Sequence, residues 1–375
     1  MSILIGADIV PTLLNLDLFV AGDALNLLGN ALFALLKSAD YRVFNLETPL
    51  TDICSPIEKR GPALHADCET VNAMKNMNVN LFTLANNHIL DQGNSGLEST
   101  FKTLEQKEIA YLGAGKNLHE AQKPYIVTID EKKFGFYACA ENEFSIATEK
   151  SAGANPFDAL ESFDHVANLR AECDCVVVLY HGGKEHYRYP SPMLQKVCRK
   201  FIEKGANLVV CQHSHCIGCE EKFKNGTIVY GQGNFLFDSC GGSFADQSLL
   251  IRLSDDLQVE YIPLIRQNHS VRLAEGEVGE KILKEFKNRS EQIKEEGFVE
   301  NEYAKFAERM IARYLVHFSG YSHKLLYFIL KKLFRRRFNK MFVKAYKKNE
   351  LLAIQNFVEC EAHRELLLRG LKKRE

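Results

Sequence analysis

Two short polar clusters in this 375-residue chain combine side chains that hold metal ions with side chains that move protons. The clusters are Asn86-Asn87-His88 with Asp91, and His213-Ser214-His215. Each directly follows an apolar run that is typical of a buried strand, 79–85 for the first and 206–211 for the second. Ligands of open α/β sheets gather beyond the carboxyl ends of the strands, so we expect both clusters at such an edge. Imidazole and amide groups in this position indicate a transition-metal site.

Ligand-type side chains follow other strand-like runs as well. They are Asp8 after the first run, Asn45 and Glu47 after the second, and His181 after the run 176–180. In an extended segment residues i and i+2 face the same way, so His213 and His215 can address one centre. Metal-assisted hydrolysis needs such a ligand cage, an open position and a proton donor for the leaving group.

The composition is that of an ordinary globular protein, with 46% hydrophobic residues, 25% charged residues and a formal net charge of −1. The balanced charge gives no reason to expect a nucleic-acid partner. Eleven cysteines without regular spacing argue against a disulfide framework and favour a reducing compartment. We find neither a basic leader nor an apolar run long enough to cross a bilayer. The sequence therefore predicts a cytoplasmic protein, with peripheral membrane contact left open.

Strand-like runs alternate with helix-like stretches up to about residue 265, which predicts an α/β fold with some parallel strands. The predicted strands are 3–5, 42–45, 80–85, 134–138, 175–180, 208–211 and 227–230, and the predicted helices are 23–38, 96–107, 156–170 and 192–204. Residues 247–265 alternate as a hairpin. From about residue 275 helical periodicity takes over. We therefore predict one domain over 1–270 and a helical, basic extension over 275–375.

The segment 321–348 holds ten Lys or Arg residues and no acid, interleaved with apolar residues at helical spacing. One interpretation is a solvated helix whose apolar stripe packs on the main domain. Another is an amphipathic helix that rests on anionic lipid. Nucleic-acid binding is the least favoured, because the aromatic residues follow a helical stripe rather than a stacking platform.

The order of these motifs resembles the bacterial capsule-synthesis CapA-like family, which is associated with poly-γ-glutamate and polysaccharide capsules. The resemblance covers roughly residues 3–265. The matching blocks are Gly6-Ala7-Asp8, Asn45-Leu46-Glu47-Thr48-Pro49-Leu50-Thr51, 85–93, Gly113-Ala114-Gly115, His181-Gly182-Gly183-Lys184-Glu185, Gln212-His213-Ser214-His215 and 230–235. The family's fold is similar to that of calcineurin-like metallophosphoesterases. The resemblance thus implies an α/β sandwich of mixed sheets flanked by helices, with a C-terminal helical extension.

The same resemblance implies roles for individual residues. The implied metal ligands are Asp8, Glu47, Asn87, His181, His213 and His215. His88 matches the residue that contacts the substrate or protonates the leaving group, and we expect Asp91 to orient it. The candidate substrate contacts are Asn45, Lys59, Glu185 and Asn234, of which Asn234 is also placed to hydrogen-bond a ligand histidine.

One departure from the phosphoesterase pattern concerns its first motif, an aspartate and a histidine two residues apart. Position 10 is Val10, so the site at this motif loses a ligand. The weakened site comprises Asp8, Glu47 and His215, and the complete one comprises Glu47, Asn87, His181 and His213. We predict one firmly bound divalent transition metal and a weaker second one, with Zn²⁺, Mn²⁺ and Fe all suited to the mixed ligands.

We predict a metal-dependent hydrolase of phosphoesters or phosphodiesters, with an anionic polymer or phosphoester substrate, that serves capsule or cell-surface polymer synthesis. Two alternatives stay open. The first keeps the metal site but cleaves a γ-glutamyl amide, because the family's polymer is a polyamide. The second is a non-catalytic component of capsule assembly that binds polymer or a partner, which Val10 and the basic segment favour.

Overall fold

The computed structural model describes residues 1–237, 244–319, 329, 332–333, 343–344 and 346–372. Two compact units divide the chain, Met1–Val299 and Glu300–Glu375. The C-terminal helical part of the chain begins with α8 (Gly276–Gln292). This start agrees with residue 275, where the sequence predicts that the helical extension begins. However, α8 packs on strands of the first unit, so that unit extends beyond the domain of 1–270 proposed from the sequence.

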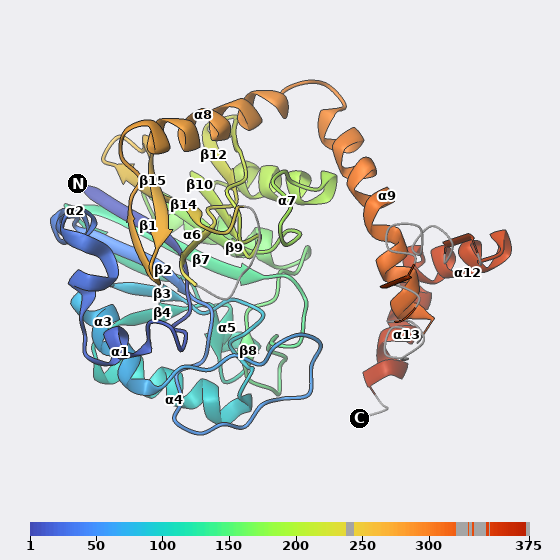
Figure 1. Ribbon diagram of the computed structural model, residues 1–375, viewed down its shortest axis with the longest axis horizontal. Coiled ribbons are helices and arrows are strands. Elements are labelled where there is room, and N and C mark those ends of the chain that lie inside the picture. The colour runs from blue at the N-terminus through green and yellow to red at the C-terminus, as the bar shows by residue number, and fades with distance from the viewer. Residues whose placement is uncertain (238–243, 320–328, 330–331, 334–342, 345, 373–375) are drawn as a thin grey trace. The chain divides into compact units, whose positions relative to one another are not determined.

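The first sheet has eight strands in the order β16-β15-β14-β1-β2-β3-β4, with β13 paired to β1. Figure 1 shows β1, β2, β3 and β4 side by side. Its strands are β1 (Ser2–Ile9), β2 (Tyr41–Leu46), β3 (Leu81–Thr83), β4 (Ala110–Leu112), β13 (Asn234–Leu236), β14 (Gln247–Ser254), β15 (Val259–Gln267) and β16 (Ser270–Leu273). Strands β1 to β4 run parallel, and β14 to β16 are antiparallel to their neighbours. The parallel strands therefore all end at one edge of this sheet.

The second sheet has six strands in the order β11-β12-β10-β9-β7-β6. Its strands are β6 (Tyr125–Ile129), β7 (Lys132–Ala140), β9 (Cys175–His181), β10 (Leu208–Gln212), β11 (Glu220–Phe223) and β12 (Gly226–Tyr230). Its four central strands are parallel, and β6 and β11 are antiparallel edges. A small ribbon joins β5 (Ala114–Gly115) to β8 (Gly153–Ala154).

Helices cover the outer face of each sheet. The remaining helices of the first unit are α1 (Leu16–Val20), α2 (Ala24–Ser38), the 3₁₀ turn η1 (Cys68–Thr70), α3 (Val71–Asn76), α4 (Gly93–Gln106), α5 (Leu118–Ala121), α6 (Ser162–Glu172) and α7 (Pro192–Glu203). Helices α2, α3 and α4 share one buried cluster with the first sheet, and α6 and α7 share another with the second. The layers are thus helix, sheet, sheet and helix.

The alternation of apolar residues explains these layers. In β1, Ile3 and Ile5 point into the space between the two sheets, whereas Leu4 points to the helices of the first layer. In β9, Val177 packs between the sheets and Val178 packs against α6 and α7. Each such side chain stabilises the fold by about 1.5–3 kcal/mol when fully buried. A one-residue slip would exchange the two faces, so the pattern determines the register.

The predicted α/β sandwich of mixed sheets with flanking helices and a C-terminal helical part is confirmed. All seven predicted strands are present, and residues 247–265 form the predicted hairpin, β14 with β15. The sequence analysis did not predict β4, β5, β6, β8, β11, β13 or β16. Strands β4, β5, β8 and β13 are two or three residues long, too short to carry an alternating pattern. Strands β6, β11 and β16 are edge strands of four or five residues.

The second unit is helical where it is described. Its helices are α9 (Phe298–Phe318), which begins at the end of the first unit, α12 (Lys348–Glu359) and α13 (Glu361–Lys372). Most of the basic segment 321–348 lies outside the described residues. In the ranges that the structure describes, no helix is both long and apolar enough to cross a membrane.

Candidate metal centre

The carboxyl ends of the two sheets meet, and there the predicted ligands come together. Asp8 lies near the end of β1, Glu47 directly follows β2 and Asn87 lies four residues after β3. From the second sheet, His181 ends β9, and His213 and His215 follow β10. All six side chains are at least 92% buried. The first sheet therefore contributes oxygen ligands and the second contributes imidazoles.

Four potential ligand atoms converge around His181. Its Nε2 lies 3.1 Å from Asn87 Oδ1, 3.1 Å from His213 Nδ1 and 3.2 Å from Glu47 Oε1. A single N–H on this ring nitrogen could serve only one of these three neighbours. Ligands bound at about 2.0–2.1 Å stand about 3.0–3.4 Å from one another in octahedral or tetrahedral geometry. We call these four residues the His181 side of the centre.

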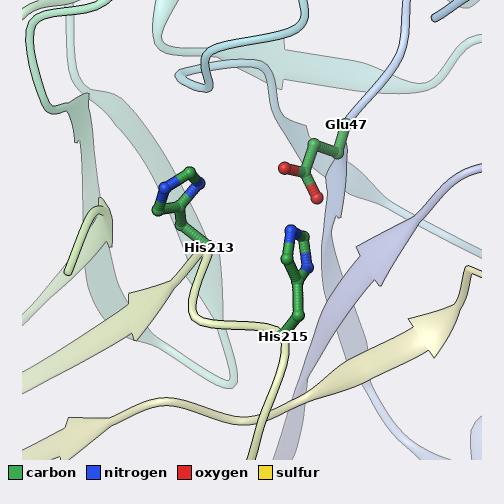
Figure 2. Close-up of side chains that lie close together, drawn as sticks. All are labelled: Glu47, His213 and His215. Carbon is green, nitrogen blue, oxygen red and sulfur yellow. The ribbon is translucent and has the colours of Figure 1, made fainter. Parts of the chain in front are cut away.

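Glu47 belongs to the His181 side and also lies close to the His215 imidazole. Potential ligand atoms of Glu47, His213 and His215 all lie within 4.8 Å of one another. Figure 2 shows the His215 ring pointing toward the Glu47 carboxylate, with His213 on the other side of the same space. Glu47 would therefore be available as a ligand together with His213 or with His215.

The two buried carboxylates, Asp8 and Glu47, differ in how far neighbouring groups compensate their charge. Among the residues that the structure describes, no group donates a hydrogen bond to either oxygen of Glu47 or to Asp8 Oδ2. Burial, together with the neighbouring Asp8 charge, raises the pKa of Glu47 to about 8. Burial also acts to raise the pKa of Asp8, but the nearby His215, His181 and Asn45 together lower it. Buried carboxylates in this condition favour a bound cation.

Burial favours the neutral, metal-binding form of two of the imidazoles, His181 and His213. Burial lowers the pKa of His181 to about 3 and lowers that of His213 well below its usual value. His213 and His215 adopt positive φ angles of 83° and 53°, a conformation that L-residues seldom adopt. Such a conformation costs about 1–3 kcal/mol and persists where the surrounding structure enforces it. The turn after β10 is therefore destabilised locally by the conformation that directs both rings toward the centre.

The other side of the centre, which we call the Asp8 side, comprises Asp8, His215 and Asn234. His215 Nδ1 lies 2.9 Å from Asn234 Oδ1 and 3.6 Å from Asp8 Oδ2. Asn234 is beside Asp8 because β13 pairs with β1 in that register. Val10, where the phosphoesterase pattern has a histidine, is a buried apolar residue. Of the two contacts expected for Asn234, with the substrate and with a ligand histidine, the structure shows the one with a histidine, His215.

A second polar group lies next to Asn87. His88 Nδ1 is 2.5 Å from Asp91 Oδ2, and Lys59 Nζ is 2.5 Å from the other oxygen of Asp91. Lys59 also donates to the Asn87 carbonyl over 3.1 Å, and its side chain is only 2% exposed. The sequence suggested a substrate contact for Lys59. The structure places its ammonium group against Asp91 instead, where it compensates a fully buried carboxylate.

Two further predicted substrate contacts lie elsewhere. Asn45 is fully buried beneath the ligands, donates to Asp8 Oδ1 over 2.8 Å and lies 3.3 Å from His181 Nδ1. Asn45 therefore contacts two predicted ligands and is not exposed to a substrate from solvent. Glu185 is exposed at the rim and within electrostatic range of His213 and His215, and Lys184 is its ion-pair partner.

Sequence reasoning gave no role to three residues that hold this site. Asn86 donates to Asn45 Oδ1 and to the Leu46 carbonyl, and its own Oδ1 accepts from the His88 backbone. Glu143 and Ser145 both contact Asn87. The loop that carries Glu143 and Ser145 follows the predicted strand 134–138. An acidic residue after this strand, as after the others, was the signal in the sequence that could have identified Glu143.

The donor set suits a divalent transition ion. It combines carboxylate, amide and imidazole groups, and its spacing on the His181 side is that of atoms sharing one ion. Two layers of mixed sheet and this centre define an α/β protein built around a candidate metal site. The chain belongs to the family described as bacterial capsule synthesis protein PGA_cap, whose model matches residues 21–239.

Curated relatives carry the same association. The chain is 28% identical over 247 residues to the capsule biosynthesis protein CapA of Bacillus anthracis, covering 63% of this chain and 60% of that protein. It is 26% identical over 222 residues to the PGA biosynthesis protein CapA of Bacillus subtilis strain 168, covering 58% of each. The chain thus spans about three fifths of the length of these relatives.

Among solved structures, one match is a phosphatase from Mycoplasma pneumoniae. The TM-score is 0.43 at 14% identity, with 71% of this chain and 93% of that chain covered. Likeness at this level says nothing about activity.

Proposed function

We propose that this protein is a metal-dependent hydrolase of phosphoesters or phosphodiesters that serves capsule or cell-surface polymer synthesis. The observation that carries the proposal is the convergence of three potential ligand atoms within 3.2 Å of His181 Nε2, next to His88. Membership of the capsule-synthesis family supports the link to polymer. The proposed substrate is an anionic polymer or a smaller phosphoester.

The His181 side would hold one divalent ion firmly, through Glu47, Asn87, His181 and His213. The Asp8 side would hold a second ion more weakly, because Val10 supplies no ligand there. A bound ion of this kind, Zn²⁺, Mn²⁺ or Fe, polarises a phosphoryl oxygen and stabilises the charge that develops on it.

His88 would supply the proton to the leaving oxygen. Its Nδ1 faces Asp91, so Nε2 is the nitrogen left for the substrate. Asp91 would hold the ring in this orientation. Lys59 would keep Asp91 in place and balance its charge. Asn87 and His88 are adjacent in the chain, which couples the position of the proton donor to that of a ligand.

The test is hydrolysis by the full chain after loading with Mn²⁺ or Zn²⁺. A panel of phosphomonoesters, phosphodiesters and γ-glutamyl peptides separates the proposed activity from the amidase alternative. We expect release of the leaving group from at least one phosphoester, and loss of this activity in His88→Ala. A loaded protein that cleaves none of the phosphoesters would overturn the proposal, and cleavage of γ-glutamyl peptides alone would favour the amidase.

A non-catalytic assembly component is the second candidate, favoured by the buried Val10 on the Asp8 side. It predicts that His88→Ala leaves polymer output of a producing cell unchanged, whereas truncation after Val299, the end of the first unit, abolishes it. The reverse pattern supports the enzyme.

Membrane contact through 321–348 is a separate proposal, based on its ten basic residues without an acid. Sedimentation with vesicles should increase with the fraction of anionic lipid, because each basic residue near such a surface contributes about 1 kcal/mol. Sedimentation that does not respond to anionic lipid would refute it.

A further inference from the structure

The loop of residues 141–147 contacts ligand segments of both sheets, although no predicted ligand lies in it. It follows β7, the parallel strand of the second sheet that ends beside β9. Glu141 Oε1 accepts from the Gly183 backbone over 3.0 Å, two residues after His181. Glu143 Oε2 accepts from Asn87 Nδ2 over 3.1 Å. Ser145 Oγ donates to the Asn87 carbonyl over 2.7 Å.

The contact with Glu143 determines which end of the Asn87 amide faces the centre. An asparagine amide presents either its oxygen or its NH₂ group after a half-turn, and only the oxygen can bind a cation. An ionised carboxylate accepts hydrogen bonds and donates none, so Glu143 selects the orientation in which Nδ2 points to it. Asn87 Oδ1 then points to His181 Nε2, 3.1 Å away.

The geometry points to Glu143 as a positioning residue that orients Asn87 toward the metal and strengthens its oxygen as a ligand. A carboxylate that accepts from the NH₂ group polarises the amide and places more negative charge on Oδ1. Ser145 holds the Asn87 backbone, and Glu141 joins the same loop to the segment after His181. The loop thereby ties an oxygen ligand of one sheet to an imidazole of the other. This inference rests on the proposed metal centre, but not on hydrolysis.

Substitution of Glu143 is a clean test because its side chain is exposed, so its removal leaves the core intact. The full chain is titrated with Mn²⁺ by calorimetry. We expect Glu143→Ala to weaken binding about 10- to 100-fold, the usual cost of losing such a contact. Glu143→Gln keeps an oxygen acceptor and should recover most of this loss. The matched control is Glu149→Ala, a second exposed glutamate of the same connection, which should bind Mn²⁺ like the unsubstituted protein.

A double-substitution cycle separates positioning from a general effect of charge. If Glu143 acts through Asn87, Glu143→Ala should cause no further loss in a protein that already carries Asn87→Ala. The absorption spectrum of the Co²⁺-loaded protein should change in Glu143→Ala and return toward the original in Glu143→Gln.

Three results would overturn the inference. They are Mn²⁺ affinity of Glu143→Ala equal to that of Glu149→Ala, equal losses in the Ala and Gln variants, and additive losses with Asn87→Ala. A protein that binds Mn²⁺ as described but hydrolyses no phosphoester would refute the proposed activity alone. Failure of the unsubstituted chain to bind Mn²⁺ would refute both.

Discussion

The His181 side and the Asp8 side of the centre lie at the same strand ends but differ in their potential ligands and in the distances between them. On the His181 side, three potential ligand atoms lie within 3.2 Å of one imidazole nitrogen. On the Asp8 side, the His215 nitrogen nearest the carboxylate is 3.6 Å away and contacts the Asn234 amide at 2.9 Å. Val10, two residues after Asp8, is a buried apolar residue that supplies no ligand.

This difference teaches that strand ends alone do not make two equal metal sites. Each side has a buried carboxylate and an imidazole, but on the His181 side three donor atoms lie within 3.2 Å of a fourth. Affinity depends on the number and geometry of ligands, so one firm and one weak ion are expected. The following variants break or sharpen this contrast.

The largest effect is expected from His181→Ala, which removes the atom around which the firm site is built. Mn²⁺ affinity should fall by more than the roughly 100-fold that loss of an outer contact costs, and hydrolysis should fall to background. Calorimetry and metal content measured on the purified protein check this. His215→Ala is the matched variant of the Asp8 side and should keep the firm ion. Equal losses in the two variants would show that the sides are equivalent.

His88→Ala should lower kcat by about 10²–10⁴-fold, the usual contribution of a positioned proton donor. Metal content should stay unchanged, because His88 Nδ1 contacts Asp91 and His88 is not one of the four residues of the His181 side. Steady-state kinetics and metal analysis on one preparation separate the two effects. A parallel loss of metal would mean that His88 is a ligand.

Removal of metal by a chelator should lower the melting temperature. An ion present at about 100 times its Kd contributes about 2.7 kcal/mol of stability, which corresponds to a shift of roughly 4 °C for a unit that spans Met1–Val299. The physical cause is the buried Glu47 carboxylate, which loses its compensating charge. Differential scanning calorimetry with and without chelator measures the shift. In His181→Ala, which should not hold the firm ion, the chelator should have little effect.

The smallest effect is expected from Val10→His, which restores the ligand that the Asp8 side lacks. The bound Mn²⁺ should rise from one to two ions per chain. Because Val10 is buried, the larger ring should also cost about 1–3 kcal/mol of stability. Val10→Leu controls for size alone and should leave the stoichiometry at one. An unchanged stoichiometry in Val10→His would mean that Val10 does not limit the second site.

Much of the fold could be predicted because its signals are local. Alternation in β1 and β9 assigns each apolar residue to one face, and the loop-borne histidines directly follow apolar runs. Short strands such as β13 were missed, and with them the pairing that brings Asn234 beside Asp8. The role expected for Asn45 differs from its position, since burial depends on what packs above a strand end and not on the strand itself.

The sequence by itself determined which residue types stand at the strand ends, and therefore the kind of chemistry. Periodicity and ligand preference depend on neighbours in the chain, so they can be read without a structure. Only the tertiary structure decided which atoms face one another. Asn87 and His181 are 94 residues apart, and Lys59 reaches Asp91 across 32. The first contact joins strand ends of two sheets that pack face to face, and the second joins two loops of the first sheet. No local pattern records the partner that a buried polar group will find.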